Sequence, residues 1–328
     1  MGILHAGIVN ALPSCKVTAI CETEPLLTRV AKKILRGVAF YKDASEMVQN
    51  ETIDAVFITS PIQTHTSIIR SLLKSGAKPG LFSEKPLAAN SADALQVAEA
   101  ATKQQVVNMV GFHKRFSPVL RHAKQLLEGG AIGEVQSVRC CTYTSDIFRK
   151  GSGWRFRKGA GGVLLDLGPH LLDLLLWWFG EPKSVSAVER SFYSSEVEDY
   201  VHAIVRFRSD VIASLDISWS QRGYRLPEIG LEVQGTNGSM SVSDDYVRIH
   251  ADKPVRGVIE AGRHVFQRPA FNTSVDFLLA EPEYTFEDKS FLMAIMEGNQ
   301  EVEPNFHTAA KVNEFVDLIH KEAAHEAR

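Results

Sequence analysis

Short apolar runs alternate with longer amphipathic stretches through the first 120 residues or so of this chain. The short runs are typical of buried strands, and the amphipathic stretches have the period of helices. The expected strands are Lys16–Cys21, Asp54–Thr59, Leu81–Ser83 and Val106–Val110, and the expected helices are Pro25–Leu35, His65–Ser75 and Ser91–Lys103. We take Ser91 as the N-cap of the last of these helices. Strands and helices alternating at this spacing predict βαβ units and a parallel sheet.

The pattern changes after Pro118, where strand-like runs follow one another with short turns between them. A helix that ends at Gly129-Gly130 comes first. The expected strands are then Glu134–Tyr143, Tyr200–Phe207, Val211–Trp219, Leu231–Gln234 and Ser239–Val242, and helices return at Asp288–Glu297 and Thr308–Ala324. This order predicts an α+β domain with a mostly antiparallel sheet. We therefore expect two domains, residues 1–117 and 118–328, with the last helix free to pack on the first domain.

Composition narrows the class of protein. The 328 residues are 45% hydrophobic, and 36 basic against 39 acidic side chains give a net charge of −3. So small a charge gives no basic surface for nucleic acid or an anionic membrane. The most apolar stretch, Gly162–Phe179, is interrupted by charged residues and a proline, which favours a buried segment over a membrane span.

Cysteines and histidines show no metal-ligand spacing, so we predict no metal site. No basic and apolar leader opens the chain, and four cysteines without a framework fit a reduced cytoplasmic protein.

The first residues read directly as a helix, MGILHAGIVNAL. Gly2 fits the last glycine of the dinucleotide-binding pattern G-x-G-x-x-G, whose strand and first two glycines are absent. We therefore expect the natural polypeptide to be longer, and this chain to be truncated at its N-terminus. Glu22 follows Gly2 by 20 residues, the position of an acid that binds the cofactor ribose. Spacing alone leaves open whether Glu22 is instead a solvated loop acid.

Two polar groups directly follow expected strands, where open α/β sheets bind their ligands. Ser60 and Pro61, with His65 in the next helix, follow the strand Asp54–Thr59. This group also fits a plain strand-to-helix turn. Glu84-Lys85-Pro86 follows the strand Leu81–Ser83. Lys85 is a candidate for polarising a substrate oxygen, although a surface lysine beside an acid is the commoner case.

Asp166 and His170 are four residues apart at the start of the apolar segment, a spacing that can place both on one side of it. A carboxylate can orient an imidazole, and histidine titrates near neutral pH, as proton transfer requires. The alternative is an N-cap aspartate and a core histidine. Burial of a polar pair in so apolar a stretch needs partners, which favours the functional reading.

Taken together, these residues resemble the Gfo/Idh/MocA oxidoreductases, the family of glucose–fructose oxidoreductase and inositol dehydrogenase. The resemblance extends along nearly the whole chain, and its specificity lies in the order and spacing of the motifs. They are Met1-Gly2 with His5-Ala6, Thr59-Ser60-Pro61 with His65, Glu84-Lys85-Pro86, Gly111-Phe112 with Arg115-Phe116 and Pro118, Trp154-Arg155, Gly161-Gly162, Asp166, Gly168, His170 and Asp173.

The resemblance implies a Rossmann domain followed by an α+β domain whose open sheet joins subunits into a homo-dimer or homo-tetramer. It implies a nicotinamide cofactor and a sugar, nucleotide sugar or cyclitol substrate. By position, Lys85, Asp166 and His170 correspond to the catalytic residues. Cofactor contacts are expected from Gly2, Glu22, Ser60, Pro61, His65, Glu84 and Lys85, and substrate contacts from Arg115, Trp154 and Arg155.

The expected function is hydride transfer between NAD and a secondary alcohol, with His170 as the base. Glu22 favours NAD over NADP, because an acid at that place repels a 2′-phosphate. Two alternatives stay open. One is a ligand-binding or regulatory protein without catalysis, because fold does not fix function. The other is a hydrolase or lyase that retains its NAD through each turnover.

Overall fold

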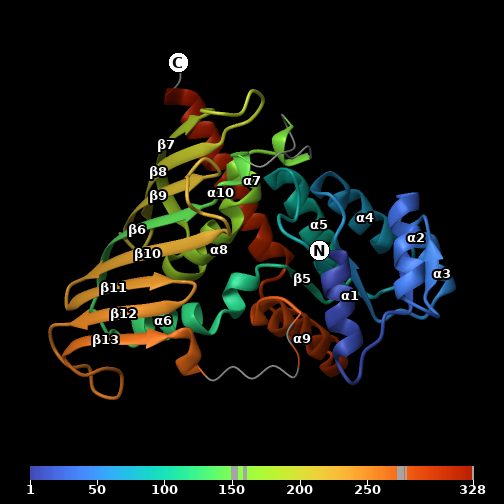
Figure 1. Ribbon diagram of the computed structural model, residues 1–328, viewed down its shortest axis with the longest axis horizontal. Coiled ribbons are helices and arrows are strands. Elements are labelled where there is room, and N and C mark those ends of the chain that lie inside the picture. The colour runs from blue at the N-terminus through green and yellow to red at the C-terminus, as the bar shows by residue number, and fades with distance from the viewer. Residues whose placement is uncertain (149–153, 158–160, 272–276, 278, 327–328) are drawn as a thin grey trace. The chain divides into compact units, whose positions relative to one another are not determined.

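The computed structural model describes residues 1–148, 154–157, 161–271, 277 and 279–326, apart from the side chains of Trp154 and Glu326. The chain forms two compact units (Figure 1). Unit 1 comprises residues 1–112 and 275–311, and unit 2 comprises residues 113–274 and 312–328. The boundary expected at residue 117 separates a cofactor-binding domain from a substrate-binding domain, and this division of function stays a prediction.

Unit 1 contains parallel strands connected by helices. Its elements are α1 (Gly2–Ala11), β1 (Ala19–Cys21), α2 (Pro25–Ile34), β2 (Ala39–Tyr41), α3 (Ala44–Asn50), β3 (Ala55–Ile58), α4 (Ile62–Lys74), β4 (Gly80–Ser83), α5 (Ser91–Lys103), β5 (Asn108–Val110) and α9 (Pro282–Glu297). β1 pairs with β2, and β3, β4 and β5 form a separate sheet in that order, with every pair parallel. The predicted parallel, Rossmann-type architecture is therefore confirmed.

The central strand β4 is buried on both faces, which explains its continuous apolar sequence. Its Phe82 stacks near Phe57 of β3, with ring centroids 4.8 Å apart. Phe291 of α9 completes this core, 5.4 Å from the ring of Phe57 and 5.6 Å from that of Phe82. Helix α9 therefore belongs to the packing of unit 1, although it lies far along the chain.

Helix α5 begins where the pattern predicted, but its N-cap is Asn90 and not Ser91. The Asn90 side-chain oxygen accepts a hydrogen bond of 2.9 Å from the backbone N–H of Asp93. Either residue type can cap a helix, so composition alone did not distinguish the two neighbours.

Unit 2 is built around one large sheet. Its elements are the short 3₁₀ turns η1 (His113–Phe116), η2 (Asp146–Phe148), η3 (Trp154–Phe156) and η4 (Arg268–Phe271), the helices α6 (Pro118–Glu128), α7 (Val163–Asp166) and α8 (Gly168–Phe179), and the strands β6 (Val135–Tyr143), β7 (Pro182–Arg190), β8 (Tyr200–Phe207), β9 (Ile212–Ser218), β10 (Glu228–Gly235), β11 (Gly238–Ser243), β12 (Tyr246–Ala251) and β13 (Gly262–Gln267). Helix α10 (Phe306–Glu326) begins in unit 1 and continues into unit 2.

The eight strands follow the order β13-β12-β11-β10-β6-β9-β8-β7, with β6 in the interior of the sheet (Figure 1). β6 and β9 are parallel, and the other neighbours are antiparallel. The predicted mostly antiparallel sheet is therefore confirmed. It also gains β7, β12 and β13, which the apolar pattern did not mark as separate strands.

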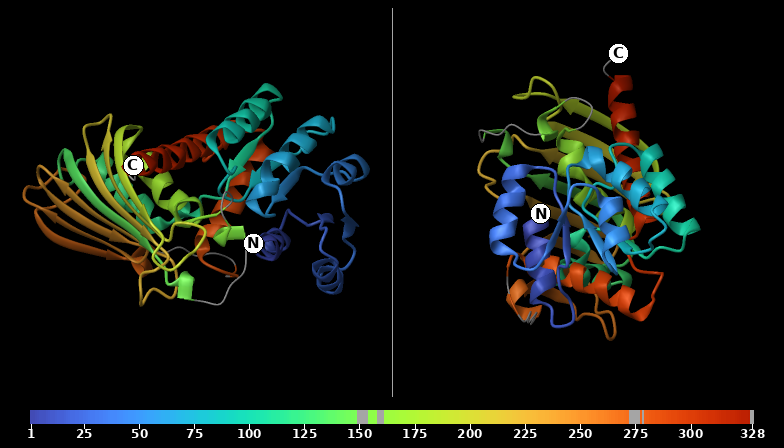
Figure 2. Two further views of the ribbon diagram at one scale, coloured as in Figure 1. Left: turned by 90° about the horizontal axis from the view of Figure 1, so that it is seen from above. Right: turned by 90° about the vertical axis from the view of Figure 1, so that its right-hand side faces the viewer.

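Helices cover one face of this sheet, and no helix among the described residues lies on the other face (Figure 2, left). α6 contacts β11 and β12, α7 contacts β8 and β9, and α8 contacts β6. β8 alternates accordingly, with Val201, Ala203, Val205 and Phe207 buried against the helices. No helix in the described part of the chain is long and apolar enough to cross a membrane.

Candidate active site

Three strands of unit 1 end in polar residues at their carboxyl ends. Glu22 directly follows β1, Ser60 and Pro61 follow β3, and the Glu84-Lys85-Pro86 segment follows β4. The Glu22 carboxylate is partly exposed and accepts a hydrogen bond of 2.8 Å from the backbone N–H of Glu24. β3 and β4 are parallel neighbours, so Ser60, Pro61 and the Glu84-Lys85-Pro86 segment lie at the edge where α/β sheets bind dinucleotides, whereas Glu22 follows a strand of the separate β1-β2 sheet.

His65, in the first turn of α4, holds two of these loops. Its Nε2 lies 2.8 Å from the carbonyl oxygen of Ser60, and its Nδ1 lies 3.0 Å from the carbonyl oxygen of Pro86. Burial lowers the pKa of His65 more than these backbone contacts raise it, which favours the neutral ring. A neutral ring carries one N–H, so His65 donates a hydrogen bond to one of the two carbonyl oxygens and lies beside the other, between the loops after β3 and β4. The peptide bond between Lys85 and Pro86 is cis.

Gly2 allows the first turn of α1 to approach the end of β3 closely. A Cβ at this position would lie 2.8 Å from Oγ1 of Thr59, closer than real Cβ contacts. No side chain caps this end of α1. A glycine at the helix–strand contact and a first turn with open N–H groups are the features that hold a pyrophosphate. The residues of unit 1 therefore fit a bound dinucleotide.

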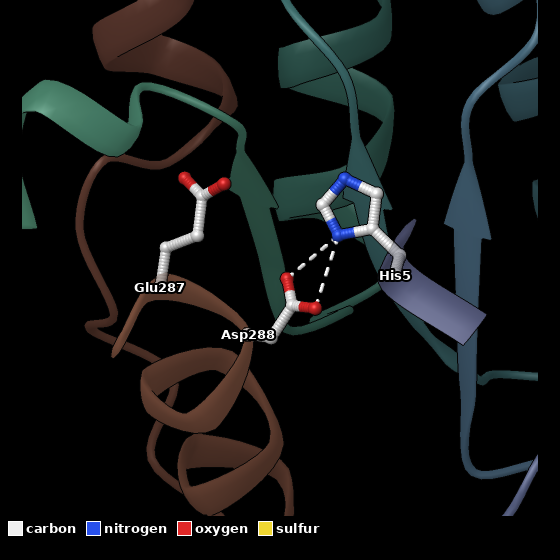
Figure 3. Close-up of side chains that lie close together, drawn as sticks. All are labelled: His5, Glu287 and Asp288. Carbon is white, nitrogen blue, oxygen red and sulfur yellow. Dashed lines mark hydrogen bonds and ion pairs between the residues drawn. The ribbon is translucent and has the colours of Figure 1, made fainter. Parts of the chain in front are cut away.

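His5, Glu84, Glu287 and Asp288 form a buried polar cluster in unit 1. His5 Nδ1 lies 2.8 and 3.0 Å from the two carboxylate oxygens of Asp288, and His5 Nε2 lies 3.1 Å from Oε1 of Glu84 (Figure 3 draws all but Glu84). Burial lowers the pKa of His5, but the hydrogen bonds and charges of both carboxylates raise it to about 9. Burial and the surrounding acids raise the pKa of Glu287 well above its usual range.

Sequence reasoning missed this cluster, apart from Glu84. The histidines show no metal-ligand spacing in the sequence, and the helix carrying Asp288 is expected there to begin only at that residue. The signal was present as three acids in one and a half turns of α9, at Glu283, Glu287 and Asp288, all buried. Acids in a sequence are normally solvated, so only the tertiary packing distinguishes these three.

In unit 2, Asp166 and His170 lie on two short helices and not on one. α7 ends at Asp166, and α8 begins at Gly168 with Pro169 in its first turn. The Asp166 carboxylate accepts a hydrogen bond of 3.2 Å from Nη1 of Arg155. His170 is partly buried, and its ring meets that of His113 edge-on, with centroids 4.6 Å apart.

The start of α7 is fixed by Glu198. Its carboxylate accepts a hydrogen bond of 3.0 Å from the backbone N–H of Leu164, and its carbonyl oxygen accepts one from Val163. Gly162 precedes the helix with a φ of 113°, and a Cβ there would lie 2.1 Å from a carboxylate oxygen of Glu198. The Gly161-Gly162 motif therefore allows this acid to seat the helix that carries Asp166.

Arg115, expected at the substrate, pairs with Asp173 of α8. Its Nε and Nη2 each donate a hydrogen bond of 2.7 Å to a carboxylate oxygen of Asp173. Its guanidinium also lies 5.4 Å from the ring of Trp177. Arg155 donates a second hydrogen bond, of 3.3 Å, to Asp146. The side chain of Trp154 lies outside the described residues.

Two family models match the chain. Residues 1–112 match the oxidoreductase family with an NAD-binding Rossmann fold, and residues 120–241 match the GFO/IDH/MocA C-terminal domain. The chain belongs to the Gfo/Idh/MocA family. The first match makes unit 1 the family's NAD-binding domain, and the second contains Asp166 and His170.

Two curated relatives of this Gfo/Idh/MocA protein are a dehydrogenase of scyllo-inositol and a dehydrogenase of levoglucosan. Scyllo-inositol 2-dehydrogenase (NAD(+)) of Bacillus subtilis is 29% identical over 250 residues, which cover 74% of this chain and 70% of the relative. Levoglucosan dehydrogenase of Pseudarthrobacter phenanthrenivorans is 28% identical over 259 residues, which cover 70% of this chain and 65% of the relative.

The fold of this Gfo/Idh/MocA chain also matches solved structures. Levoglucosan dehydrogenase, solved in complex with NADH and levoglucosan, superposes with a TM-score of 0.87 at 24% identity. The match covers 99% of this chain and 95% of that structure. At this identity the likeness establishes the shared fold.

Proposed function

We propose that this protein is an NAD-dependent dehydrogenase that oxidises a secondary alcohol of a sugar, nucleotide sugar or cyclitol. The observation that carries the proposal is the break between α7 and α8 in unit 2. It presents a partly exposed imidazole, His170, in the first turn of α8, while the Asp166 carboxylate is held by Arg155. Relatives that act on inositols and on levoglucosan support this substrate class.

His170 takes the proton of the substrate hydroxyl as the general base. The negative charge of Asp166 favours the imidazolium that forms, and Arg155 keeps that carboxylate in place. The Lys85 ammonium group donates a hydrogen bond to the reacting oxygen and stabilises its developing negative charge. Arg115, Trp154 and Arg155 are the residues we assign to the substrate.

NAD supplies the acceptor for the hydride when it is bound. We assign its contacts to the strand ends of unit 1: Gly2 at the pyrophosphate, Glu22 at the ribose, and Ser60, Pro61, His65, Glu84 and Lys85 around the loops after β3 and β4. The close approach of Gly2 to Thr59 supports this assignment, because a larger side chain would push α1 away from β3.

The test is a screen of sugars, nucleotide sugars and cyclitols with NAD, followed by the absorbance of the reduced cofactor. With a substrate found, His170→Ala should lower kcat by roughly 10²–10⁴-fold. The matched control is His250→Ala, on β12, whose side chain is 48% exposed. Equal kcat in both variants would remove His170 from the mechanism.

The same screen separates the alternatives. Turnover without release of NADH would indicate an enzyme that retains its cofactor, and binding without turnover would indicate a regulatory protein. Lys85→Ala should abolish most turnover, and it should leave NAD affinity nearly unchanged if the lysine faces the substrate. Loss of NAD affinity with full activity at saturating cofactor would move Lys85 from the substrate to the cofactor.

We further propose that the face of the large sheet that carries no helix joins subunits into a homo-dimer or homo-tetramer. Ile204 of β8 and Ile212 of the neighbouring strand β9 are 51% and 48% exposed. Large apolar side chains exposed together on adjacent strands are typical of an interaction surface. Ile204→Arg should convert the oligomer to a monomer in light scattering after gel filtration. A wild-type protein that is monomeric at every concentration tested would refute this proposal.

A further inference from the structure

The buried cluster in unit 1 gathers acids from distant parts of the chain. His5 comes from α1, Glu84 from the loop after β4, and Glu287 and Asp288 from α9. The side chains of His5, Glu84 and Asp288 are 2%, 10% and 0% exposed, and Glu287 is 0% exposed. Water therefore cannot solvate these charges.

The charges within the cluster do not balance. Glu84, Glu287 and Asp288 bring three carboxylates. His5 brings at most one positive charge, shared between Asp288 at Nδ1 and Glu84 at Nε2. An uncompensated buried carboxylate is strongly unfavourable, so this site calls for a further cation.

Glu287 indicates the position of this further cation. Both of its carboxylate oxygens are buried and have no hydrogen-bond partner among the described residues. Protonation would not resolve this, because a protonated carboxyl needs an acceptor for its O–H. Buried polar groups are almost always paired with protein, water or an ion. An unpartnered, fully buried acid beside two further ligand groups therefore points to a bound ion.

The geometry assigns to His5, Glu287 and Asp288 the binding of one divalent transition-metal cation. One nitrogen or oxygen atom from each residue lies within 4.8 Å of those of the other two (Figure 3). Small side-chain rotations would bring them to the metal–ligand distances of about 2.0–2.2 Å. Glu84 would stay on His5 Nε2, the carboxylate–histidine arrangement that orients a metal-bound imidazole.

The ligand set selects the kind of cation. One imidazole with two carboxylates suits Zn²⁺ or Mn²⁺. Ca²⁺ takes six to eight oxygen ligands, and Mg²⁺ prefers carboxylates, phosphates and water, so neither matches a set that includes an imidazole. The cation would connect α1 to α9, so its role is to hold unit 1 together and not to carry out chemistry. This inference does not depend on the proposed dehydrogenase activity.

The test begins with the metal content of the purified protein and continues with protein stripped by a chelator. Stripped protein is incubated with ZnCl₂, MnCl₂, MgCl₂ or CaCl₂, and melting temperature and calorimetric stoichiometry are measured. We expect one Zn²⁺ or Mn²⁺ per chain and a rise of several degrees in Tm at saturation, with no rise for Mg²⁺ or Ca²⁺. No stoichiometric binding and no rise with any of the four would overturn the proposal.

Two variants locate the binding. Glu287→Gln keeps the shape of the side chain and removes a buried charge, so it should fold and bind the cation at least 10-fold more weakly. Glu297→Gln, an exposed acid at the end of the same helix, should bind like the wild type. Equal affinity in Glu287→Gln and the wild type would place the metal elsewhere and refute the site. Asp288→Asn serves as an independent second ligand variant with the same expected loss.

Discussion

Replacing Arg115 by methionine should destabilise unit 2 strongly. The Arg115 side chain is 10% exposed and its partner Asp173 is 0% exposed, and two hydrogen bonds of 2.7 Å join them. Arg115→Met removes one partner of this buried ion pair while Asp173 stays buried, and breaking such a pair costs about 3–5 kcal/mol. Each kcal/mol shifts the Tm of a unit of this size by about 2–4 °C, so the shift is roughly 6–20 °C downward.

The assay is calorimetric melting, checked by urea unfolding, with Arg206→Met as the matched control. Arg206 pairs with Asp210 at the surface, where the two side chains are 54% and 72% exposed, and exposed pairs contribute about 0–1 kcal/mol. The double variant Arg115→Met with Asp173→Leu should recover most of the loss, because no charge stays buried. Equal losses in Arg115→Met and Arg206→Met would refute the argument and return Arg115 to a role at the substrate alone.

Three further predictions follow from single contacts. Burial lowers the pKa of His320, but its hydrogen bond and charge contact with Glu189 raise the pKa above 6.5 overall. The contribution of this pair to stability is therefore complete below pH 6.5 and is lost as pH rises through the folded-state pKa. The Tm difference between wild type and His320→Gln should shrink between pH 6 and pH 10, and a constant difference would contradict this prediction. Gly162→Ala should lower both Tm and kcat. Gly223→Ala, at a φ of 94° with no neighbour within 4 Å, should cost only backbone strain of about 1–3 kcal/mol and leave kcat unchanged. Similar effects of the two substitutions would argue against a role for the close approach of Gly162 to Glu198. Because of Glu22, kcat/KM should be higher with NAD than with NADP, and Glu22→Gln should lower the ratio of these two values. A wild-type preference for NADP would exclude Glu22 from binding the ribose.

Local sequence patterns predicted the elements well because each depends on neighbouring residues. β8 lies at Tyr200–Phe207, as expected, because its alternation of buried and exposed positions can be read directly. The break at Leu167 was missed, although Pro169 in the first turn of α8 is a local signal for a new helix start. The start of α7, by contrast, depends on Glu198, a residue from a distant part of the chain.

The same distinction between local features and distant contacts applies to the site residues. Residues at strand ends, such as Ser60 and Lys85, could be placed from the sequence because strand ends are local features. The cluster of His5, Glu84 and Asp288 could not, because α1 and α9 meet only in the folded unit. Whether a charged side chain is solvated or buried is decided by such contacts, and the sequence carries no short-range signal for it.

Each unit is built from two separate segments of the chain, which affects how the protein folds during its synthesis. The ribosome releases the first 112 residues long before α9, whose Phe291 completes the core beside Phe57 and Phe82. β6 likewise waits for its partners, because Ser137 pairs with Ile212 and Cys141 with Gly230. Such non-local pairing is slow and leaves apolar strands exposed on the nascent chain. We expect the chain to remain dependent on chaperones until nearly all of it has been translated, so that a premature stop before residue 275 leaves neither unit able to fold.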